Sequence, residues 1–212
     1  MAAEPGRYEL HYQDETHVET NPSLGRVWHR VGEQPTLPAA GSNRRLTVFG
    51  SVAAGGRGRV EVVGVRADSA GFARYLEALD ERRAATGRDV ILVLDNGSCH
   101  TSKRSQQALA DRAAWLEVVP LARYSPELNP KEREWRWLKR DHRSHLAGDL
   151  RTFVSELVAG LHRLGGERCD IVEAVPDWWL AGHRTPPTGR PVGRPKGSRT
   201  PPADAANLPA CT

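Results

Sequence analysis

The spacing of hydrophobic and polar residues changes along the chain, from strand-like segments in the first third to mixed segments after it. Residues 8–12 alternate weakly between the two types, which predicts a strand that ends at Asp14. Residues 46–54 and 59–65 are rich in β-branched residues and are separated by a glycine-rich turn, so they predict a hairpin. A further short strand is predicted at residues 26–31.

From residue 69 the apolar residues recur at the spacing of an amphipathic helix, which is predicted to end near Gly87. Residues 90–94 then form an unbroken apolar run, which predicts a strand buried on both faces. The elements predicted after it are a helix at 103–112, a strand at 115–119, a helix that opens near Asn129 and an amphipathic helix around 153–164. Strands followed by alternating helices and strands predict an α/β fold with a mixed sheet.

The composition divides the chain into two parts. Residues 1–180 carry the predicted elements and are expected to form one domain, whereas residues 181–212 are rich in Pro, Gly and Arg and are expected to be disordered. No apolar run approaches the roughly 20 residues of a membrane span, and the first residues lack the pattern of a signal peptide. Three widely separated cysteines argue for a reducing cytosol and against a zinc knuckle or a disulfide scaffold.

The net charge of +4 is concentrated in the tail. From His183 onward the chain holds five basic residues and one acid, whereas the preceding part holds 25 basic and 25 acidic residues. A neutral body with a basic tail predicts an anionic partner that is reached mainly through the tail.

Asp95 is a candidate ligand for metal-dependent chemistry, because it directly follows the apolar run. Ligand sites of open α/β sheets gather at such strand ends. Phosphodiester cleavage by two metal ions requires carboxylates that converge on the ions. The neighbouring Asn96-Gly97 leaves a second interpretation open, in which Asp95 only closes an Asx turn.

Glu132 lies in the first turn of the helix that opens at Asn129. With Asn129 as the N-cap, Glu132 takes the third helical position, where a capping box would explain it without catalysis. Trp135, Arg136 and Lys139 follow at three, four and seven residues and are predicted to share its helix face. An acid flanked by cations favours a nucleic-acid site, and a solvated charged face is the alternative.

Asp14 ends the first predicted strand, and Glu15 beside it could take its place. On position alone, both are surface acids.

Two phrases carry a family resemblance, VILVLDNGSCH at residues 90–100 and YSPELNPKEREWRWLK at residues 124–139. They resemble the second and third catalytic blocks of mariner-like DDE transposases of the bacterial insertion-sequence branch, with 36 residues between Asp95 and Glu132. The phrase HYQDETHVETNPSLGRVWHRVGEQPTLP, which starts at residue 11, resembles the first block and supplies Asp14. The resemblance covers about residues 8–164.

This resemblance implies an RNase H-like, retroviral integrase-like mixed sheet with flanking helices. It implies that Asp14, Asp95 and Glu132 are catalytic and hold two Mg²⁺ ions, with Mn²⁺ as a possible substitute. The implied reaction is cleavage of DNA strands and their transfer during insertion-sequence transposition.

Three positions need comment against the family pattern. His100 matches a histidine common in the second block, where it could orient water or a phosphate or serve the structure alone. Lys131 stands where the family usually carries an apolar residue, and Ala122-Arg123 replace a Pro-rich pair. We expect both departures to be tolerated, because neither removes a predicted metal ligand.

The resemblance also implies partners. Family members carry an N-terminal helix-turn-helix that reads the transposon ends, and this sequence starts almost directly at the first predicted catalytic strand. We expect either a helix-turn-helix product from an upstream reading frame or an inactive remnant that only binds DNA. Paired-end chemistry implies a homodimer on transposon-end and target DNA, in the cytoplasm at the nucleoid and without a membrane. A stand-alone RNase H-like nuclease is the remaining alternative.

Residues 189–199 read GRPVGRPKGSR and resemble an AT-hook, which lays Arg side chains in the narrow minor groove of A·T tracts. A low-complexity basic tail that binds DNA by counterion release, or one produced by frame drift, would have the same composition. The residues expected to bind DNA, on the helix face and in the tail, are Arg136, Lys139, Arg190, Arg194, Lys196 and Arg199.

Overall fold

A six-stranded mixed sheet forms the centre of the fold in this computed structural model, which describes residues 6–21, 28, 30–33, 43–56, 58–122, 125–142, 149–166 and 169–184. Its strands are β1 (Tyr8–Glu19), β2 (Arg45–Ala53), β3 (Arg59–Gly64), β4 (Asp89–Leu94), β5 (Leu116–Pro120) and β6 (Cys169–Glu173). They lie in the order β5-β4-β1-β2-β3-β6. β2 is antiparallel to β1 and β3, while β4, β5 and β6 pair in parallel with β1, β4 and β3. The predicted α/β fold with a mixed sheet is confirmed.

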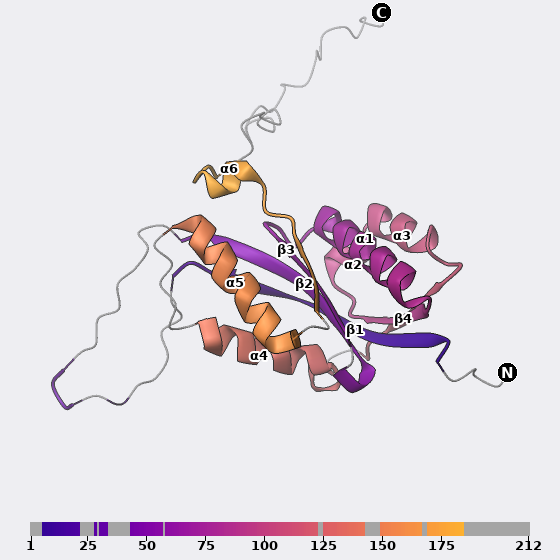
Figure 1. Cartoon of the computed structure of the whole chain (residues 1–212), viewed down its shortest axis with the longest axis horizontal. Helices are drawn as coiled ribbons and strands as arrows, with labels where there is room; N and C mark the ends of the chain where they lie inside the picture. Colours follow the sequence, from indigo (N-terminus) through magenta and orange to yellow (C-terminus); the bar gives the residue numbers. More distant parts are fainter. Residues whose placement is uncertain are drawn as a thin grey trace, which may run out of the picture.

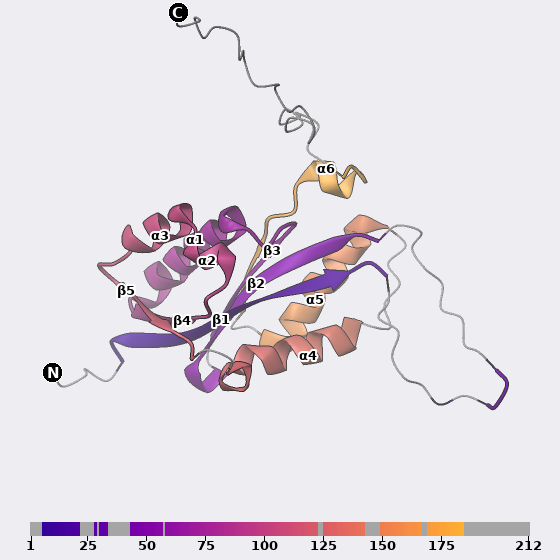
Figure 2. The same cartoon turned by 180° about the vertical axis from the view of Figure 1, so that it is seen from behind.

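Helices cover both faces of this sheet (Figures 1 and 2). They are α1 (Ser69–Thr86), α2 (Ser98–Thr101), α3 (Lys103–Ala110), α4 (Pro130–His142), α5 (Leu150–Gly165) and α6 (Asp177–Leu180), with 3-10 turns η1 (Ala54–Gly56) and η2 (Pro126–Leu128). The helices α1, α2 and α3 lie on one face of the sheet, and α4 and α5 lie on the other.

Each face of the sheet has its own apolar core. On one face, Phe72, Leu76 and Leu79 of α1 are fully buried against alternate residues of β3 and β4, as their helical spacing predicted. On the other face, α4 and α5 pack on β2 and β3 through residues such as Leu138 and Phe153. The strands of the centre are therefore covered on both sides, which leaves only their ends open to a ligand.

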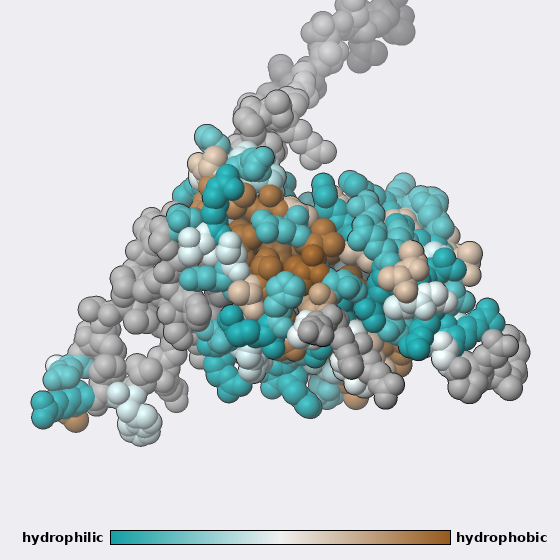
Figure 3. Space-filling model, viewed as in Figure 1, coloured by the Kyte–Doolittle hydropathy of each residue, from teal (hydrophilic) through white to brown (hydrophobic). Residues whose placement is uncertain are grey.

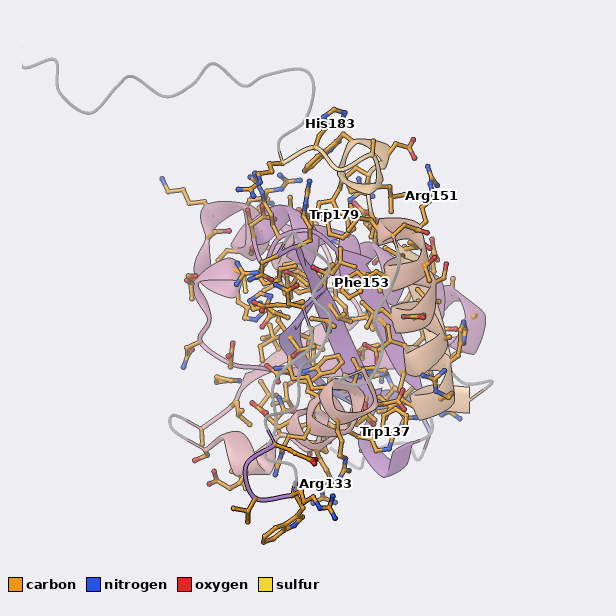
Figure 4. The ribbon with its side chains drawn as sticks, turned by 90° about the vertical axis from the view of Figure 1, so that its left-hand side faces the viewer. Arg133, Trp137, Arg151, Phe153, Trp179 and His183 are labelled. Atoms are coloured by element: carbon orange, nitrogen blue, oxygen red, sulfur yellow. The ribbon has the colours of Figure 1, made fainter. Side chains whose placement is uncertain are left out.

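The short helix α6 closes the second core at the C-terminal end of the described chain. Its Trp179 is 3% exposed and stacks on Phe153 of α5, with ring centroids 6.5 Å apart (Figure 4). Figure 3 shows apolar side chains gathered between α5 and α1, where β6 runs. Ile171 and Val172 of β6 and Val175, which follows it, are half-buried. Among the described helices, none has the length and apolar character needed to cross a membrane.

β1 is longer than the sequence pattern predicted. The pattern ended this strand at Asp14, but residues 15–19 continue it and pair with residues 45–49 of β2. Buried and exposed side chains alternate through Val18 and Glu19, so this polar stretch still has one face in the core. Asp14 therefore lies inside a central strand and not at its end.

Three further features of the chain differ from the sequence prediction or lie outside the described residues. Of the strand predicted at 26–31, residues 26, 27 and 29 lie outside the described residues, and residues 28, 30 and 31 are not in a strand. The pattern missed β6, whose five half-buried or exposed residues do not alternate strictly. Residues 185–212 lie outside the described part of the chain, so the disordered tail expected from residue 181 stays a prediction.

Candidate active site

Asp14 and Asp95 are neighbours across the two central parallel strands. Tyr12 of β1 pairs with Val93 of β4, so two residues further on Asp14 stands level with Asp95, directly after β4. Successive strand residues point to opposite faces. Asp14 takes the face that α4 covers, since Gly50, its β2 partner, lies against α4 side chains. The parallel register thus brings together two acids that are distant in sequence.

Asn129 holds the first turn of α4 against β1. Its side chain is buried, its Nδ2 donates to the Gln13 carbonyl oxygen at 2.9 Å, and its Oδ1 accepts from the Lys131 N–H at 3.0 Å. Gln13 directly precedes Asp14 in β1. This one side chain therefore places the turn that carries Glu132 beside the first acid.

The capping-box interpretation of Glu132 is only half fulfilled. Asn129 caps the helix as predicted, but it does so through the Lys131 N–H. The Glu132 carboxylate is half-buried, and it forms no hydrogen bond or ion pair with any other residue that the structure describes. It is consequently available for a ligand from outside the chain.

The acids repel one another. The pKa of the Asp14 carboxyl is raised to about 7, first by burial and then by the negative charges of Glu132, Glu15 and Asp95. Carboxylates that crowd together without a cation favour the neutral form of one of them. A divalent cation would remove this repulsion, so the electrostatics fit a site for a hard cation such as Mg²⁺.

The tightest group of acids is Asp14, Glu15 and Asp95, whose ligand oxygens all lie within 4.8 Å of one another. Within the described ranges, no group of this kind includes Glu132, although its charge acts on Asp14. Glu15, which the sequence analysis named as a possible replacement for Asp14, is therefore part of the cluster. The roles of Asp14, Asp95 and Glu132 as metal ligands stay predictions.

Asp95 both closes a turn and contacts a charged partner. Its Oδ1 accepts from the Gly97 N–H at 2.8 Å, so the Asx turn is present. His100 Nε2 lies 3.3 Å from this oxygen and 2.9 Å from Glu15 Oε1. Burial alone would lower the pKa of the His100 imidazole, but contacts with Asp95, Cys99 and Glu15 outweigh it and raise that pKa to about 11. His100 in turn holds the pKa of Asp95 below its usual value and keeps that carboxylate ionised.

Lys131 has a buried partner in place of the apolar contact that the family pattern supplies. Its side chain is fully buried, and its Nζ pairs with Glu61 of β3 and lies 2.9 Å from Glu134 Oε2. The stem of Lys131 passes over Gly50, where an added Cβ would lie 2.8 Å from Lys131 Cε and would also collide with Glu61. Asp14, Gly50 and Glu61 are paired neighbours on β1, β2 and β3. Only Gly50 therefore lies between Asp14 and Glu61 of this ion pair.

The predicted cationic face of α4 is partly correct. Arg136 and Lys139 are exposed, and Lys139 is close enough to β1 that its charge, after burial and Arg45, lowers the pKa of His17. Trp135 is 2% exposed and packs under the helix, so it takes no part in an exposed cationic face. The remaining predicted DNA-binding residues, Arg190, Arg194, Lys196 and Arg199, lie outside the described residues.

The strand order, with acids meeting at the centre of the sheet, is that of an RNase H-like fold. Residues 9–154 match the family model of the DDE superfamily endonucleases. The match spans more than half of the sequence, and the chain belongs to this family. The family resemblance of the three sequence blocks is confirmed.

One curated relative is an insertion element IS630 uncharacterized 39 kDa protein of Shigella sonnei, 31% identical over 134 residues. The match covers 62% of this chain and 38% of that protein, so the chain spans well under half the length of this relative. Two similar solved structures are the Mos1 transposase paired-end complex with left transposon end and the Mos1 mariner paired-end complex with Mn, each with a TM-score of 0.53. Their identities are 17% and 18%, and the matches cover 76% and 84% of this chain and 52% and 49% of those chains. The likeness establishes the fold and confirms the RNase H-like sheet with flanking helices.

Proposed function

We propose that this chain carries the catalytic domain of an insertion-sequence transposase, which cuts DNA strands and transfers transposon ends into target DNA. The observation that carries the proposal is the meeting of Asp14 and Asp95 across the central strands, with the turn of Glu132 held beside Asp14 by Asn129. Family membership, the Shigella sonnei insertion-element protein and the Mos1 complex with a transposon end support this substrate class.

We infer that Asp14, Asp95 and Glu132 hold two divalent ions, Mg²⁺ or Mn²⁺. The ligands are carboxylate oxygens, which hard cations prefer, and the pKa of Asp14 is raised by burial and by neighbouring negative charges that lack a counter-charge. Mos1 paired-end complexes have been solved with Mg and with Mn, which supports the choice of metal. Bound ions would supply the Lewis acid that activates an attacking water or 3′-hydroxyl and stabilises the leaving oxygen.

The residues of the chain itself prepare this site. Asp14 is fixed by hydrogen-bonded strands on both sides, and His100 keeps Asp95 ionised. Arg136 and Lys139 continue along α4 beyond Glu132, where they would bind phosphates of the DNA strand being cut. The basic tail would add affinity for DNA, and action on DNA would keep the protein at the nucleoid. A homodimer and a helix-turn-helix product from an upstream frame would complete recognition of the two transposon ends.

The test is DNA nicking by the full chain with Mg²⁺ or Mn²⁺, on plasmids with and without the flanking inverted repeats. Asp14→Asn, Asp95→Asn and Glu132→Gln are each expected to lose about 100-fold or more in rate, since metal ligation is worth several kcal/mol to this chemistry and each 1.4 kcal/mol is about tenfold. Glu117→Gln, which changes an exposed acid on β5, is the matched control and should leave the rate unchanged. Nicking that survives Asp95→Asn at the wild-type rate would disprove the assignment.

Two other outcomes would redirect the proposal. Turnover on RNA–DNA hybrids or on DNA without inverted repeats, at the same rate as on transposon ends, would identify a stand-alone nuclease. DNA binding without any metal-dependent cleavage would identify an inactive remnant.

A further inference from the structure

Three side chains with three different kinds of metal ligand meet next to the proposed catalytic acids. They are Glu15 of β1 and the neighbours Cys99 and His100 of α2, and their ligand atoms all lie within 4.8 Å of one another. Glu15 Oε1 is 3.1 Å from Cys99 Sγ and 2.9 Å from His100 Nε2. Neither Cys99 nor Glu15 belongs to the set that the proposed reaction needs.

The fold holds this group in place from two directions. Glu15 follows Asp14 in β1 and therefore points to the opposite face of the sheet, where its partner Phe49 packs in the α1 core. The helix α2 starts three residues after Asp95 and brings Cys99 and His100 to the same face. The ring of Phe72 meets the His100 ring edge to face, with centroids 4.5 Å apart, and fixes its orientation.

The imidazole of His100 is buried at the point where these ligand atoms meet. It is 3% exposed, and neither ring nitrogen has a hydrogen bond of good geometry within the described structure, although Nε2 has carboxylate oxygens of Glu15 and Asp95 within 3.3 Å. These short contacts are charge contacts at poor angles, and they mark a point toward which several ligand atoms converge. A metal ion bound at this point would take the place of the imidazole proton among the same ligand atoms.

The donor set identifies the class of cation. Mg²⁺ takes oxygen ligands almost exclusively, whereas a thiolate, an imidazole and a carboxylate together suit Zn²⁺ and Co²⁺. We propose that Glu15, Cys99 and His100 form a second metal site, separate from the three catalytic acids, that binds Zn²⁺ with its fourth position open. The sharpest distinguishing ligand is the Cys99 thiolate, because the proposed catalytic site contains only carboxylates.

A cation at this site would act on the neighbouring one. Glu15 belongs to both groups of ligand atoms, and His100 Nε2 lies 3.3 Å from Asp95. Zn²⁺ at Glu15, Cys99 and His100 would displace the imidazole and thiol protons and replace the contact that His100 makes with Asp95, and this would weaken the binding of a catalytic ion at Asp95. The expected consequence is inhibition of DNA cleavage by Zn²⁺; this consequence rests on the proposed function, whereas the binding itself does not.

Binding is tested by titrating Co²⁺ into the full chain and recording absorption. The wild type should develop a thiolate-to-cobalt charge-transfer band and the visible bands of four-coordinate Co²⁺, and Zn²⁺ should remove both. Cys99→Ser should lose the charge-transfer band, and the matched variant Cys169→Ser, which changes the half-buried cysteine of β6, should keep it. Circular dichroism checks that both variants are folded. No charge-transfer band in the wild type, or a band that persists in Cys99→Ser, would overturn the site.

Inhibition is tested by nicking in Mg²⁺ with increasing Zn²⁺. Cys99→Ser should require about tenfold or more additional Zn²⁺ for half inhibition, in line with the 10- to 100-fold loss of affinity when a group that supports a metal site is removed. Cys169→Ser should behave as the wild type does. Equal inhibition of all three proteins would show that Zn²⁺ acts at the carboxylates alone and would overturn the inhibitory role. Absence of nicking from every protein would count against the proposed function, and the cobalt spectra would still decide the site.

Discussion

The side-chain amide of Asn129 donates a hydrogen bond to the main-chain carbonyl oxygen of Gln13 at 2.9 Å, which joins α4 to the central strand across 116 residues of sequence. The same side chain caps α4 through the Lys131 N–H. A single buried amide therefore sets both where the helix starts and how far its first turn lies from Asp14.

Asn129→Ala should remove both bonds and leave the Gln13 carbonyl unpaired. We expect the free energy of unfolding to fall by about 1 to 3 kcal/mol, measured by urea denaturation. Nicking at a temperature where the variant is folded should fall further than this loss explains, because Glu132 is no longer held beside Asp14. Asp68→Ala is the control, since Asp68 caps α1 on the other face by accepting from the Ala70 and Gly71 N–H groups. Equal loss of nicking in both variants would contradict a specific role for Asn129.

Gly50→Ala should destabilise the protein by about 1 to 3 kcal/mol or more, the range for overpacking a core. The new methyl group would collide with the Glu61 carboxylate and would lie 2.6 Å from Trp135 Cη2 and 2.8 Å from Lys131 Cε. Gly64→Ala, also in the sheet, is the matched control because nothing lies within 4 Å of its Cβ position. Thermal denaturation of the two variants measures the difference, and equal midpoints would be inconsistent with the tight packing under α4.

The buried pair of Lys131 and Glu61 should behave as a coupled unit. Lys131→Met leaves the buried Glu61 without its partner and should lower the free energy of unfolding by about 3 to 5 kcal/mol, whereas Glu61→Gln leaves Lys131 paired with Glu134 and should cost less. The double variant removes both charges and should recover most of that loss. Chemical denaturation of all four proteins gives the coupling energy; additive losses would mean that the two side chains do not depend on each other. The exposed pair of Arg163 and Asp141 is a control, for which Asp141→Asn should cost less than about 1 kcal/mol.

Mn²⁺ should stabilise the wild type and not the Asp14→Asn variant. At 100 times its dissociation constant a bound ion adds about 2.7 kcal/mol, which corresponds to a rise in Tm of about 5 °C or more for a chain of this size. Without metal, Asp14→Asn should be more stable than the wild type at neutral pH by about 1 to 3 kcal/mol, because it removes a carboxylate that is partly buried and repelled by its neighbours, while solvent screens part of both effects. Differential scanning calorimetry gives both numbers. An unchanged response of Asp14→Asn to Mn²⁺ would remove Asp14 from the metal site.

Glu9 should account for much of the stability that the fold loses between about pH 4.5 and pH 2. Hydrogen bonds from His11 and from Arg82, whose Nη2 lies 2.7 Å away, lower the pKa of the Glu9 carboxyl from 4.5 to about 2 against the opposing effect of burial. A lowered pKa stabilises the folded state above the unfolded pKa, and this contribution disappears as pH falls from about 4.5 to about 2. Glu9→Gln should cost about 2 to 3 kcal/mol at pH 7 and flatten the decline in that pH window. Denaturation curves across pH that stay parallel for variant and wild type would refute this.

The elements with strong local signals could be predicted from the sequence. The apolar run before Asp95 specified a buried strand, and the spacing of Phe72, Leu76 and Leu79 specified α1. β1 was cut short because residues 15–19 carry mostly polar side chains, and their strand character comes from pairing with β2. β6 has a weak pattern of its own and depends on β3 for its place in the sheet.

The site shows the same division. Asp95 and Glu132 could be chosen from short motifs, because a strand end and a helix start are local features. The contact of Asn129 with Gln13 and the pairing of Lys131 with Glu61 join residues 116 and 70 positions apart, and no local pattern encodes them. The presence of Glu15 in the cluster likewise depends on how α2 folds back beside β1.

The position of α4 after five of the six strands has a consequence for how the protein comes into being. A ribosome makes Asp14 early and Glu132 only after β5 has been completed, so the nascent chain gains its full set of acids late. A product that stops before residue 130, through a premature stop codon or a shift of reading frame, would contain Asp14 and Asp95 but would lack α4 and its Glu132. Such fragments would lack one of the three proposed metal ligands, so the proposed reaction would require synthesis past α4.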